Sequence, residues 1–250
     1  MRAPDWLVTR PVAHRGLHDS ARGIIENMPA AAQAAISAGF SIECDIQLTA
    51  DGEAMVHHDG ELGRLTEGSG TILGMTATAL KAVKFKATSE QMMSLGDLCA
   101  LVDGRVPLVI EVKSHFNGDR KLVRRMAEVL ASYSGPAVGM SFDPDQVLAL
   151  RQIMPSLARG IVAERRYKEA EWPEATPLQR HDMTDLRHAF HTRPSFVAYR
   201  VNDLPAAAPW IARNLFGLPL LAWTVRTPGQ RARAARYADQ MIFEGFLPQA

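Results

Sequence analysis

Cysteine is scarce in this sequence, and its scarcity excludes several kinds of site. Only Cys44 and Cys99 occur among the 250 residues, and they lie far apart in the chain. Zinc sites and redox pairs of the usual kind need closely spaced cysteines, so neither is predicted. Both residues fall in apolar patterns, where a cysteine behaves as a small hydrophobic side chain. So few cysteines favour a reducing compartment, and we expect the protein to be cytoplasmic.

An excess of one charge and long apolar runs are also lacking. Lys and Arg number 28 against 27 Asp and Glu, which gives a net charge of +1. Such a balance creates no field that would attract nucleic acid or an anionic membrane. No apolar run approaches the ~18 residues of a spanning helix. The opening stretch MRAPDWLVTRPVAHRG has no apolar core of a signal peptide. We therefore expect no nucleic-acid partner and no membrane span, and the sequence leaves the oligomeric state open.

The chain does contain a regular alternation of strand-like and helical segments. Helical patterns cover residues 30–38, 121–132, 144–154, 206–214 and 230–238. Eight strand-like runs alternate with helical stretches: RPVAHRG, FSIECDIQL, VPLVIEVKS, PAVGMSF, LARGIVAE, SFVAYR, LPLLAWTVR and DQMIFEG. Alternation of this kind predicts βαβ units, and eight strands in this length predict an α/β fold of the (β/α)8 TIM-barrel class. A doubly wound open sheet is the alternative. No shift in composition marks a second domain, so residues 1–250 are expected to form one.

One segment departs from this rhythm and predicts a β-hairpin. Asp51 and Gly52 separate two alternating runs, which is a strong hairpin signal, and so short a connection requires antiparallel strands. If these two residues form the turn, Asp45 lies opposite His58. Opposed residues share a face of the ribbon, so His58 would return beside the acidic face of the first strand. A bulge would shift the pairing by one, which leaves His57 as the weaker candidate.

Acidic residues recur on one face of two strands. Glu43 and Asp45 stand two residues apart in the second run, and Glu111 and Lys113 do so in VIEVK. Residues at i and i+2 of a strand share a face, and barrel enzymes place catalytic groups at the carboxyl ends of their strands. Three inward carboxylates would repel one another without a cation, and an oxygen-rich set suits Mg²⁺ or Ca²⁺. The alternative is a structural ion-pair network of Glu111 with Lys113 or an arginine.

The end of the first strand adds a histidine and an arginine. His14 and Arg15 follow the apolar pair that opens this strand, and a planar guanidinium fits the oxygens of a phosphate. Further on, Asn27 is predicted to cap a helix that has Pro29 in its first turn. Glu26, just before the cap, is either a residue of the catalytic face or a partner of the helix dipole.

These motifs together resemble the glycerophosphodiester phosphodiesterase family. The resemblance is carried by AHRG, ENMPAAAQAAISAGF, IECDIQLTADGEAMVHHDGELGRLT, VPLVIEVKS, SFDPDQVLALR and WTVR, in this order. It implies a (β/α)8 barrel, with a small insertion at about residues 60–98 after the hairpin, and one divalent metal ion. It also implies roles for individual residues: metal ligands Glu43, Asp45 and Glu111; acid–base histidines His14 and His58; a phosphate-binding Arg15; and an active-site Lys113.

Three departures from the family pattern concern the rim of the expected site. The usual Glu-Asn-Thr reads Glu-Asn-Met, with Met28 in the third place. The usual asparagine after Trp-Thr-Val is Arg226, and the usual Thr-Asp near the end is Phe243-Glu244. The last two put contacts to the leaving group and the substrate rim in doubt, whereas the metal ligands match.

The expected function is metal-dependent hydrolysis of a glycerophosphodiester to sn-glycerol 3-phosphate and an alcohol. One histidine would take a proton from the nucleophile and the other would give one to the leaving oxygen, with His14 as base and His58 as acid. Trp223, at the end of the seventh strand, would wall the glycerol carbons or simply pack in the core. Three alternatives stay open: a metal-dependent barrel enzyme acting on sugars or keto acids, a silent binding module, and a lysophospholipase D-like enzyme with an apolar groove from residues 71–85.

Overall fold

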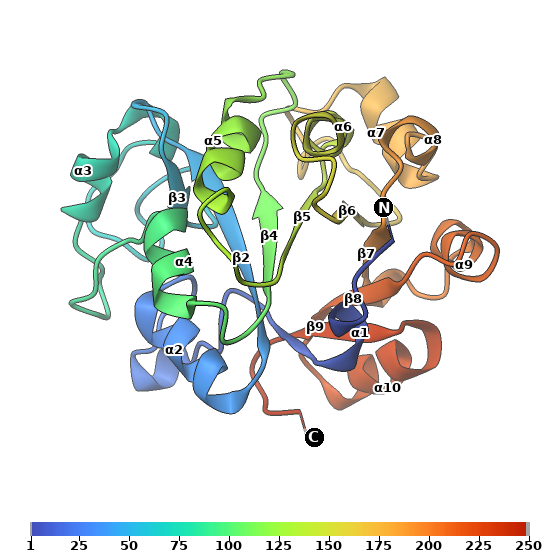
Figure 1. Ribbon diagram of the computed structural model, residues 1–250, viewed down its shortest axis with the longest axis horizontal. Helices are drawn as coiled ribbons and strands as arrows, with labels where there is room; N and C mark the ends of the chain where they lie inside the picture. Colours follow the sequence, from blue (N-terminus) through green and yellow to red (C-terminus); the bar gives the residue numbers. More distant parts are fainter. Residues whose placement is uncertain (1, 249–250) are drawn as a thin grey trace. The chain divides into compact units, whose positions relative to one another are not determined.

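The computed structural model describes residues 2–248, which fold as two compact units. The hairpin unit takes in Ala13–Lys113 and Arg120–Ala137. The five-stranded unit takes in the chain up to Val12, the segment Ser114–Asp119 and the described chain from Val138 onward. The short strand β1 (Val12–Ala13) ends where the hairpin unit begins. In both units strands and helices alternate along the chain, as the sequence pattern predicts (Figure 1).

The hairpin unit is built on three strands, β2 (Ser41–Leu48), β3 (Ala54–Val56) and β4 (Leu108–Val112). Strand β2 lies between the other two and pairs in parallel with β4 and antiparallel with β3. Its residues are buried on both faces up to the last one, and helices α2 and α5 contact this strand. The helical elements of this unit are η1 (Ser20–Arg22), α2 (Pro29–Ala38), η2 (Ile72–Gly74), α3 (Ala77–Lys81), α4 (Leu95–Val102) and α5 (Lys121–Leu130).

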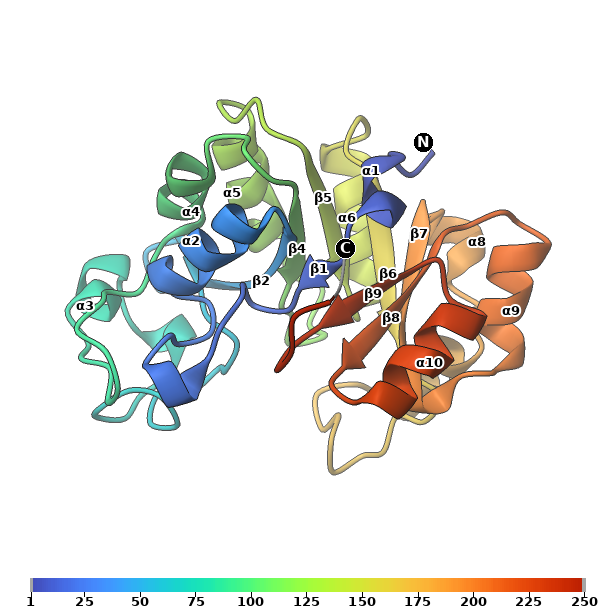
Figure 2. The same ribbon diagram turned by 90° about the horizontal axis from the view of Figure 1, so that it is seen from below.

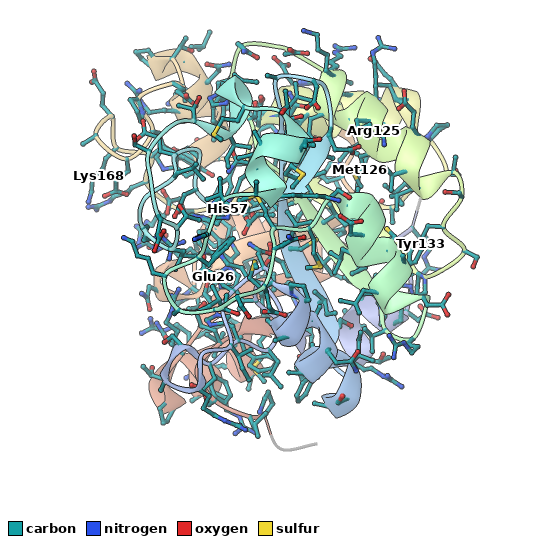
Figure 3. The ribbon with its side chains drawn as sticks, turned by 90° about the vertical axis from the view of Figure 1, so that its left-hand side faces the viewer. Glu26, His57, Arg125, Met126, Tyr133 and Lys168 are labelled. Carbon is teal, nitrogen blue, oxygen red and sulfur yellow. The ribbon has the colours of Figure 1, made fainter. Side chains whose placement is uncertain are left out.

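Helix α5 shows how the sequence pattern sets the packing of this unit. Leu122, Val123, Met126 and Val129 recur at helical spacing and are all buried, which gives the helix one apolar stripe. Arg125 lies next to Met126 but is partly exposed, and both are seen on this helix in Figure 3. The polar face therefore remains available for ion pairs at the surface.

Helix α2 begins and ends as predicted, but its N-cap residue differs from the predicted one. Pro29 occupies the first turn, and Gly39 ends the helix in the left-handed conformation with φ of 73°. The N-cap residue is Met28, and no side chain caps the helix. The predicted cap by Asn27 is therefore wrong. Asn27 lies one position before the N-cap and has a left-handed φ of 59°, whereas an N-cap residue is extended. Its amide donates to Asp45 Oδ2 at 3.0 Å, so the side chain belongs to the carboxylate rather than to the helix end.

The antiparallel hairpin is confirmed, but its predicted register is off by one residue. Ile46 pairs with Val56 and Leu48 with Ala54, and the backbone N–H of His57 donates to the carbonyl of Asp45 at 3.1 Å. His57, and not His58, therefore lies opposite Asp45. The reason is the length of the loop. Residues 49–53 form a five-residue connection, whereas the prediction assumed a two-residue turn.

The segment after the hairpin forms a small apolar core of its own. Its buried members from this segment are Ile72, Leu80, Phe85 and Met92, and they pack with Met55 of β3 and with Ile25 and Met28. Ile72 and Leu80 are fully buried. Ile72, Leu80 and Phe85 of residues 71–85 are thus used in packing, whereas Leu73 is exposed. Burial of the first three leaves less apolar surface for the groove that a lysophospholipase D-like enzyme would need.

The five-stranded unit is a parallel sheet in which neighbouring strands follow one another in the chain. Its order is β5 (Ala137–Ser141), β6 (Arg159–Ala163), β7 (Phe196–Arg200), β8 (Leu220–Val225) and β9 (Gln240–Phe243). Its helical elements are α1 (Trp6–Thr9), α6 (Pro144–Ile153), α7 (Pro177–Thr184), α8 (Ala189–Thr192), η3 (Val201–Asp203), α9 (Ala207–Asn214) and α10 (Pro228–Tyr237). Helix α10 lies along β8 and β9 (Figure 2). Among the residues described in either unit, no helix combines the length and apolar character needed to span a membrane.

Candidate active site

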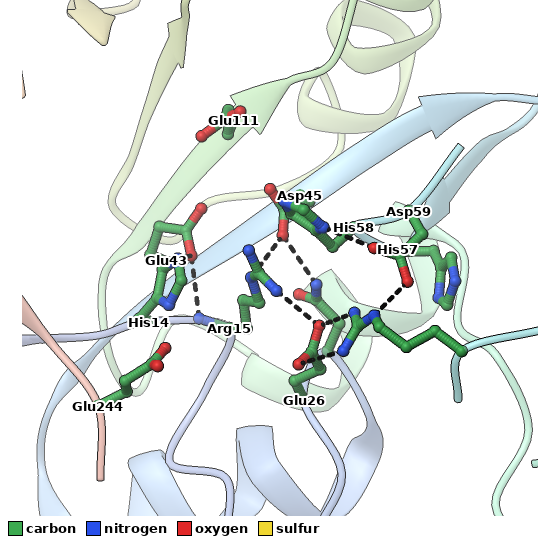
Figure 4. A network of polar contacts seen from close by, with 12 residues as sticks. His14, Arg15, Glu26, Glu43, Asp45, His57, His58, Asp59, Glu111 and Glu244 are labelled. Carbon is green, nitrogen blue, oxygen red and sulfur yellow. Dashed lines mark hydrogen bonds and ion pairs between the residues drawn. The ribbon is translucent and has the colours of Figure 1, made fainter. Parts of the chain in front are cut away.

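Three buried carboxylates meet in the hairpin unit, on the inward face of β2 and β4. Asp45 and Glu111 are direct partners across the parallel pair, and Glu43 lies one inward position earlier on β2. Glu43, Asp45 and Glu111 are each 7% exposed or less, and one oxygen of each lies within 4.8 Å of the others. Figure 4 shows the three on neighbouring strands. An all-oxygen donor set at this spacing fits a hard divalent cation such as Mg²⁺ or Ca²⁺.

The electrostatics of the cluster are those of acids held too close together. Burial, and then the charges of its acidic neighbours, raise the pKa of Glu43 well above its usual value. Burial also raises the pKa of Glu111, although Lys113 opposes this. For Asp45, burial acts in the same direction, but the charges of Lys113 and Arg15 outweigh it and hold its pKa far below the usual value. A further cation would therefore stabilise the charged forms of Glu43 and Glu111.

Lys113 supplies part of the positive charge from the end of β4. Its Nζ lies 2.7 Å from Asp45 Oδ1 and 2.7 Å from Glu111 Oε1. Burial would lower the pKa of this ammonium, but the two carboxylates raise it, so the side chain stays charged. The ion pair between Lys113 and Glu111 that the sequence left as a structural alternative is thus present. Lys113 pairs with Asp45 and Glu111 rather than with Glu43, and the pKa of Glu43 stays raised by burial and by the other two acids.

Arg15 approaches the same acids from the end of β1. Its backbone N–H donates to Glu43 Oε2 at 2.9 Å, its Nη1 lies 2.7 Å from Glu26 Oε1, and its Nε lies 3.3 Å from Asp45 Oδ2. The backbone turns sharply here, with φ of 56° at Arg15 and 79° at Gly16. A Cβ at Gly16 would come within 2.9 Å of the backbone of Ala31, so this turn needs glycine.

The histidines of the hairpin point to different environments. His58 lies beside Asp45 (Figure 4), and its Nδ1 is 2.8 Å from Asp59 Oδ1. Burial lowers the pKa of His58 to about 4. Since the carboxylate of Asp59 can only accept, Nδ1 carries the proton and Nε2 is the bare nitrogen. His57 is buried and packs edge-on against Phe85 in the insertion core, with ring centroids 6.3 Å apart.

His14 completes the group from the end of β1. Its Nε2 lies 3.9 Å from Glu43 Oε2, and its side chain is 12% exposed. The hairpin unit thus brings together seven of the eight residues that the sequence singled out: His14, Arg15, Glu43, Asp45, His58, Glu111 and Lys113.

Trp223, the eighth, lies on β8 in the five-stranded unit. Its indole N–H donates to the carbonyl of Ala198 at 3.1 Å, and its ring meets that of Phe142 edge-on, with centroids 5.3 Å apart. The same unit holds two of the departures from the family pattern, and these contact each other. The guanidinium of Arg226 pairs with the carboxylate of Glu244. The added positive charge of Arg226 is therefore balanced by Glu244, which stands where the family pattern also has an acid.

Sequence reasoning missed Gln47, which holds the backbone after β3. Its Nε2 lies 3.1, 2.9 and 2.6 Å from the carbonyl oxygens of His57, His58 and Asp59. The side chain is 6% exposed. The signal that could have found it is face parity, because Gln47 follows Glu43 and Asp45 at i+4 and i+2 on the same face of β2.

Sequence reasoning also missed the roles of three further residues, which connect Arg15 with His58. Glu26, which was left undecided, pairs with Arg15, and Asp59 pairs with the histidine that precedes it. Arg64 of the insertion joins both acids, with 2.6 Å to Glu26 Oε1 and 2.5 Å to Asp59 Oδ2. Asp59 could have been found from its place next to His58, but no local pattern marks Arg64.

Comparison with known proteins identifies the family. The model of the glycerophosphoryl diester phosphodiesterase family matches residues 14–247. The chain belongs to this family. A glycerophosphodiester phosphodiesterase of Caldanaerobacter subterraneus subsp. tengcongensis is 27% identical over 231 residues, which are 88% of this chain and 86% of that protein. The predicted enzyme class, a phosphoric diester hydrolase, is thereby confirmed.

Solved structures of the family share the fold. A phosphodiesterase of Oleispira antarctica, in complex with the product sn-glycerol-3-phosphate, aligns with a TM-score of 0.77 at 19% identity, over 95% of this chain and 93% of that one. A glycerophosphodiester phosphodiesterase of Thermotoga maritima gives 0.69 at 21% identity, over 94% of each chain. The predicted (β/α)8 barrel class is confirmed. Members of the family depend on a divalent metal ion, and the acidic cluster of Glu43, Asp45 and Glu111 is suited to hold one.

Proposed function

We propose that the enzyme hydrolyses glycerophosphodiesters to sn-glycerol 3-phosphate and an alcohol, with a divalent metal ion at Glu43, Asp45 and Glu111. The observation that carries the proposal is this buried acidic cluster with Arg15, Lys113 and His58 around it. The Oleispira antarctica relative, in complex with sn-glycerol-3-phosphate, supports the same product. The metal, when bound, would supply Lewis-acid and charge-neutralising chemistry at the phosphate.

Two cations of the chain would bind the phosphate and stabilise the charge that develops on it. The Arg15 guanidinium is fixed from two sides, by Glu26 at 2.7 Å and Asp45 at 3.3 Å, so little reorganisation is needed when the ligand binds. Lys113 is held equally firmly between Asp45 and Glu111. Fixed donors of this kind favour the transition state because their orientation costs nothing at the moment of reaction.

The two histidines would move the protons. We assign His14 as the base that takes the proton from the attacking hydroxyl, which is a neighbouring hydroxyl of the glycerol. The oxygen of this hydroxyl bonds to phosphorus. The bond between phosphorus and the oxygen of the leaving alcohol breaks, and His58 protonates that oxygen. Water then opens the resulting cyclic phosphate while the histidines exchange roles. A bound phosphate places negative charge beside His58 and raises its pKa from the low value in the unliganded protein, which is what an acid requires.

A panel of glycerophosphodiesters, with release of glycerol phosphate as readout, tests the proposal. The purified enzyme with Mg²⁺ or Ca²⁺ should turn over at least one of them, and chelation should abolish the turnover. Turnover of sugars or keto acids alone would favour a metal-dependent barrel enzyme that acts on those substrates. Release of choline from lysophosphatidylcholine alone would favour a lysophospholipase D, and ligand binding without any turnover would favour the silent binding module.

Two wider expectations accompany this function. We propose that residues 1–250 act as a single barrel domain in which residues 60–98 are an insertion. We also propose that the enzyme works in the cytoplasm, which fits two cysteines that are both free and buried. The substrate would be a small molecule of lipid and glycerol metabolism.

A further inference from the structure

The insertion reaches into the site through one side chain, that of Arg64. Its guanidinium uses all three nitrogens on two carboxylates. Nη1 and Nη2 lie 3.2 and 2.6 Å from the two oxygens of Glu26, and Nε lies 2.5 Å from Asp59 Oδ2. A planar fork that meets a carboxylate with two parallel bonds is the most specific geometry available to an arginine.

Each of these carboxylates holds a different group of the proposed machinery. Glu26 Oε1 is also bonded to Arg15 Nη1 at 2.7 Å, and Asp59 Oδ1 is bonded to His58 Nδ1 at 2.8 Å. One continuous chain of contacts therefore runs from Arg15 through Glu26, Arg64 and Asp59 to His58. The two ends of this chain are the proposed phosphate-binding group and the proposed acid.

The contacts set the charge state of both acids. Burial would raise the pKa of Glu26, but hydrogen bonds and charges from Arg64 and Arg15 hold it below its usual value. Burial also acts on Asp59, and the bonds from Arg64 and His58 again bring its pKa below the usual value. Both groups are therefore carboxylates that only accept. This fixes the Arg15 guanidinium on one side and the His58 tautomer on the other.

Stability alone gives a weak reason for such an arrangement. The side chain of Arg64 is 47% exposed, and ion pairs at this exposure contribute little to the free energy of unfolding. Positioning gives a stronger reason, because small displacements of catalytic groups reduce rates strongly. Without Arg64, Glu26 and Asp59 would each keep one partner but lose the connection that fixes their relative orientation.

We propose that Arg64 is a positioning residue, through which the insertion holds Arg15 and His58 in register with one another. The proposal rests on the function proposed above. Arg64 itself does not touch the substrate. It acts through two carboxylates, so its loss should lower kcat about tenfold and change KM less than threefold, at the low end of the effects seen for residues that orient functional groups through hydrogen bonds.

The chain offers a matched control in Arg125, on α5. Arg125 also makes a bidentate fork, with its Nε and Nη2 each 2.9 Å from an oxygen of Glu53, and its side chain is 34% exposed. It contacts neither Glu26 nor Asp59. Arg64→Met and Arg125→Met therefore remove equivalent surface forks, and they should lower the unfolding midpoint by similar, small amounts.

The experiment combines steady-state kinetics with ¹⁵N NMR of histidine-labelled protein without substrate. We expect Arg64→Met to lower kcat about tenfold and to shift the His58 imidazole nitrogens, while Arg125→Met changes neither. Arg64→Lys should recover only part of the rate, because an ammonium cannot reproduce the planar fork that meets both oxygens of Glu26. A kcat for Arg64→Met within twofold of that for Arg125→Met would overturn the proposal, as would unchanged His58 signals. If the wild type shows no turnover, the proposed function fails, and the NMR comparison still decides whether Arg64 positions His58.

Discussion

The most direct test of the site's construction is to remove the donors of Gln47. The substitution Gln47→Met keeps the length of the side chain and deletes the amide that faces three carbonyl oxygens at 2.6–3.1 Å. A net hydrogen bond contributes ~1 kcal/mol, and a buried acceptor left without a donor costs ~1–3 kcal/mol. Since the amide has only two hydrogens for the three carbonyls, we expect a loss of about 2 kcal/mol. In a chain of this size that corresponds to a fall of ~4–8 °C in Tm.

The effect on activity should exceed the effect on stability. The three carbonyls belong to the segment that carries His58, so releasing them lets the imidazole leave its place beside Asp45. We expect kcat to fall ~10–100-fold. Thermal unfolding and steady-state kinetics on the same preparations measure both quantities. Gln33→Met is the control, because Gln33 lies on exposed α2 surface and bonds only Ser37, at 3.3 Å. A Gln47→Met enzyme with wild-type kcat would refute the reasoning, whatever its Tm.

Three further predictions concern the metal ligands, the histidines of the hairpin, and His188, a buried residue just before α8 in the five-stranded unit. Glu43→Gln should abolish Mg²⁺ or Ca²⁺ binding measured by calorimetry and remove turnover, whereas the exposed control Glu67→Gln should do neither; equal metal affinity in both would contradict the ligand assignment. His58→Ala should lose ~10²–10⁴-fold in kcat, whereas His57→Ala should lose stability but little activity, and the reverse ranking would make His57 the proton donor. Burial lowers the pKa of His188 to about 4, below its unfolded value of ~6.5, so the unfolded state binds the extra proton and stability should fall by about 3 kcal/mol as the pH drops from ~6.5 to ~4. His188→Leu should flatten this part of a denaturation profile, and an unchanged slope would show that His188 is not the cause.

The acidic cluster was accessible to sequence reasoning because it depends on local geometry alone. A strand has a period of two, so Glu43 and Asp45 must share a face, and Glu111 joins them once β2 and β4 pair in parallel. The eight strands and the helices α2, α5, α6, α9 and α10 were accessible for a similar reason, since their apolar patterns repeat with the periods of regular structure.

What failed depends on competition between neighbours. The hairpin register failed because Thr49 organises a longer loop, with its hydroxyl bonded to Asp51 Oδ1 at 2.6 Å and accepting from the backbone N–H of Glu53 at 2.8 Å. The cap by Asn27 failed because this residue has a left-handed φ of 59° and lies one position before the N-cap, where its amide donates to Asp45, 18 residues away in the chain. Arg64 lies 38 residues from Glu26, and no periodicity within one element can reveal such a pair.

The apolar core of the insertion has a consequence for how this enzyme can be altered. Ile25 and Met28 are buried in that core, and they flank Glu26 and Asn27, which bond Arg15 and Asp45. The loop of residues 25–28 is thus fixed on either side of its two polar residues, because Ile25 and Met28 pack against side chains from residues 60–98. Shortening this segment, or exchanging it with that of a relative, would release the loop as well. The insertion is therefore expected to evolve together with the catalytic loop, as one inherited block rather than as an exchangeable accessory.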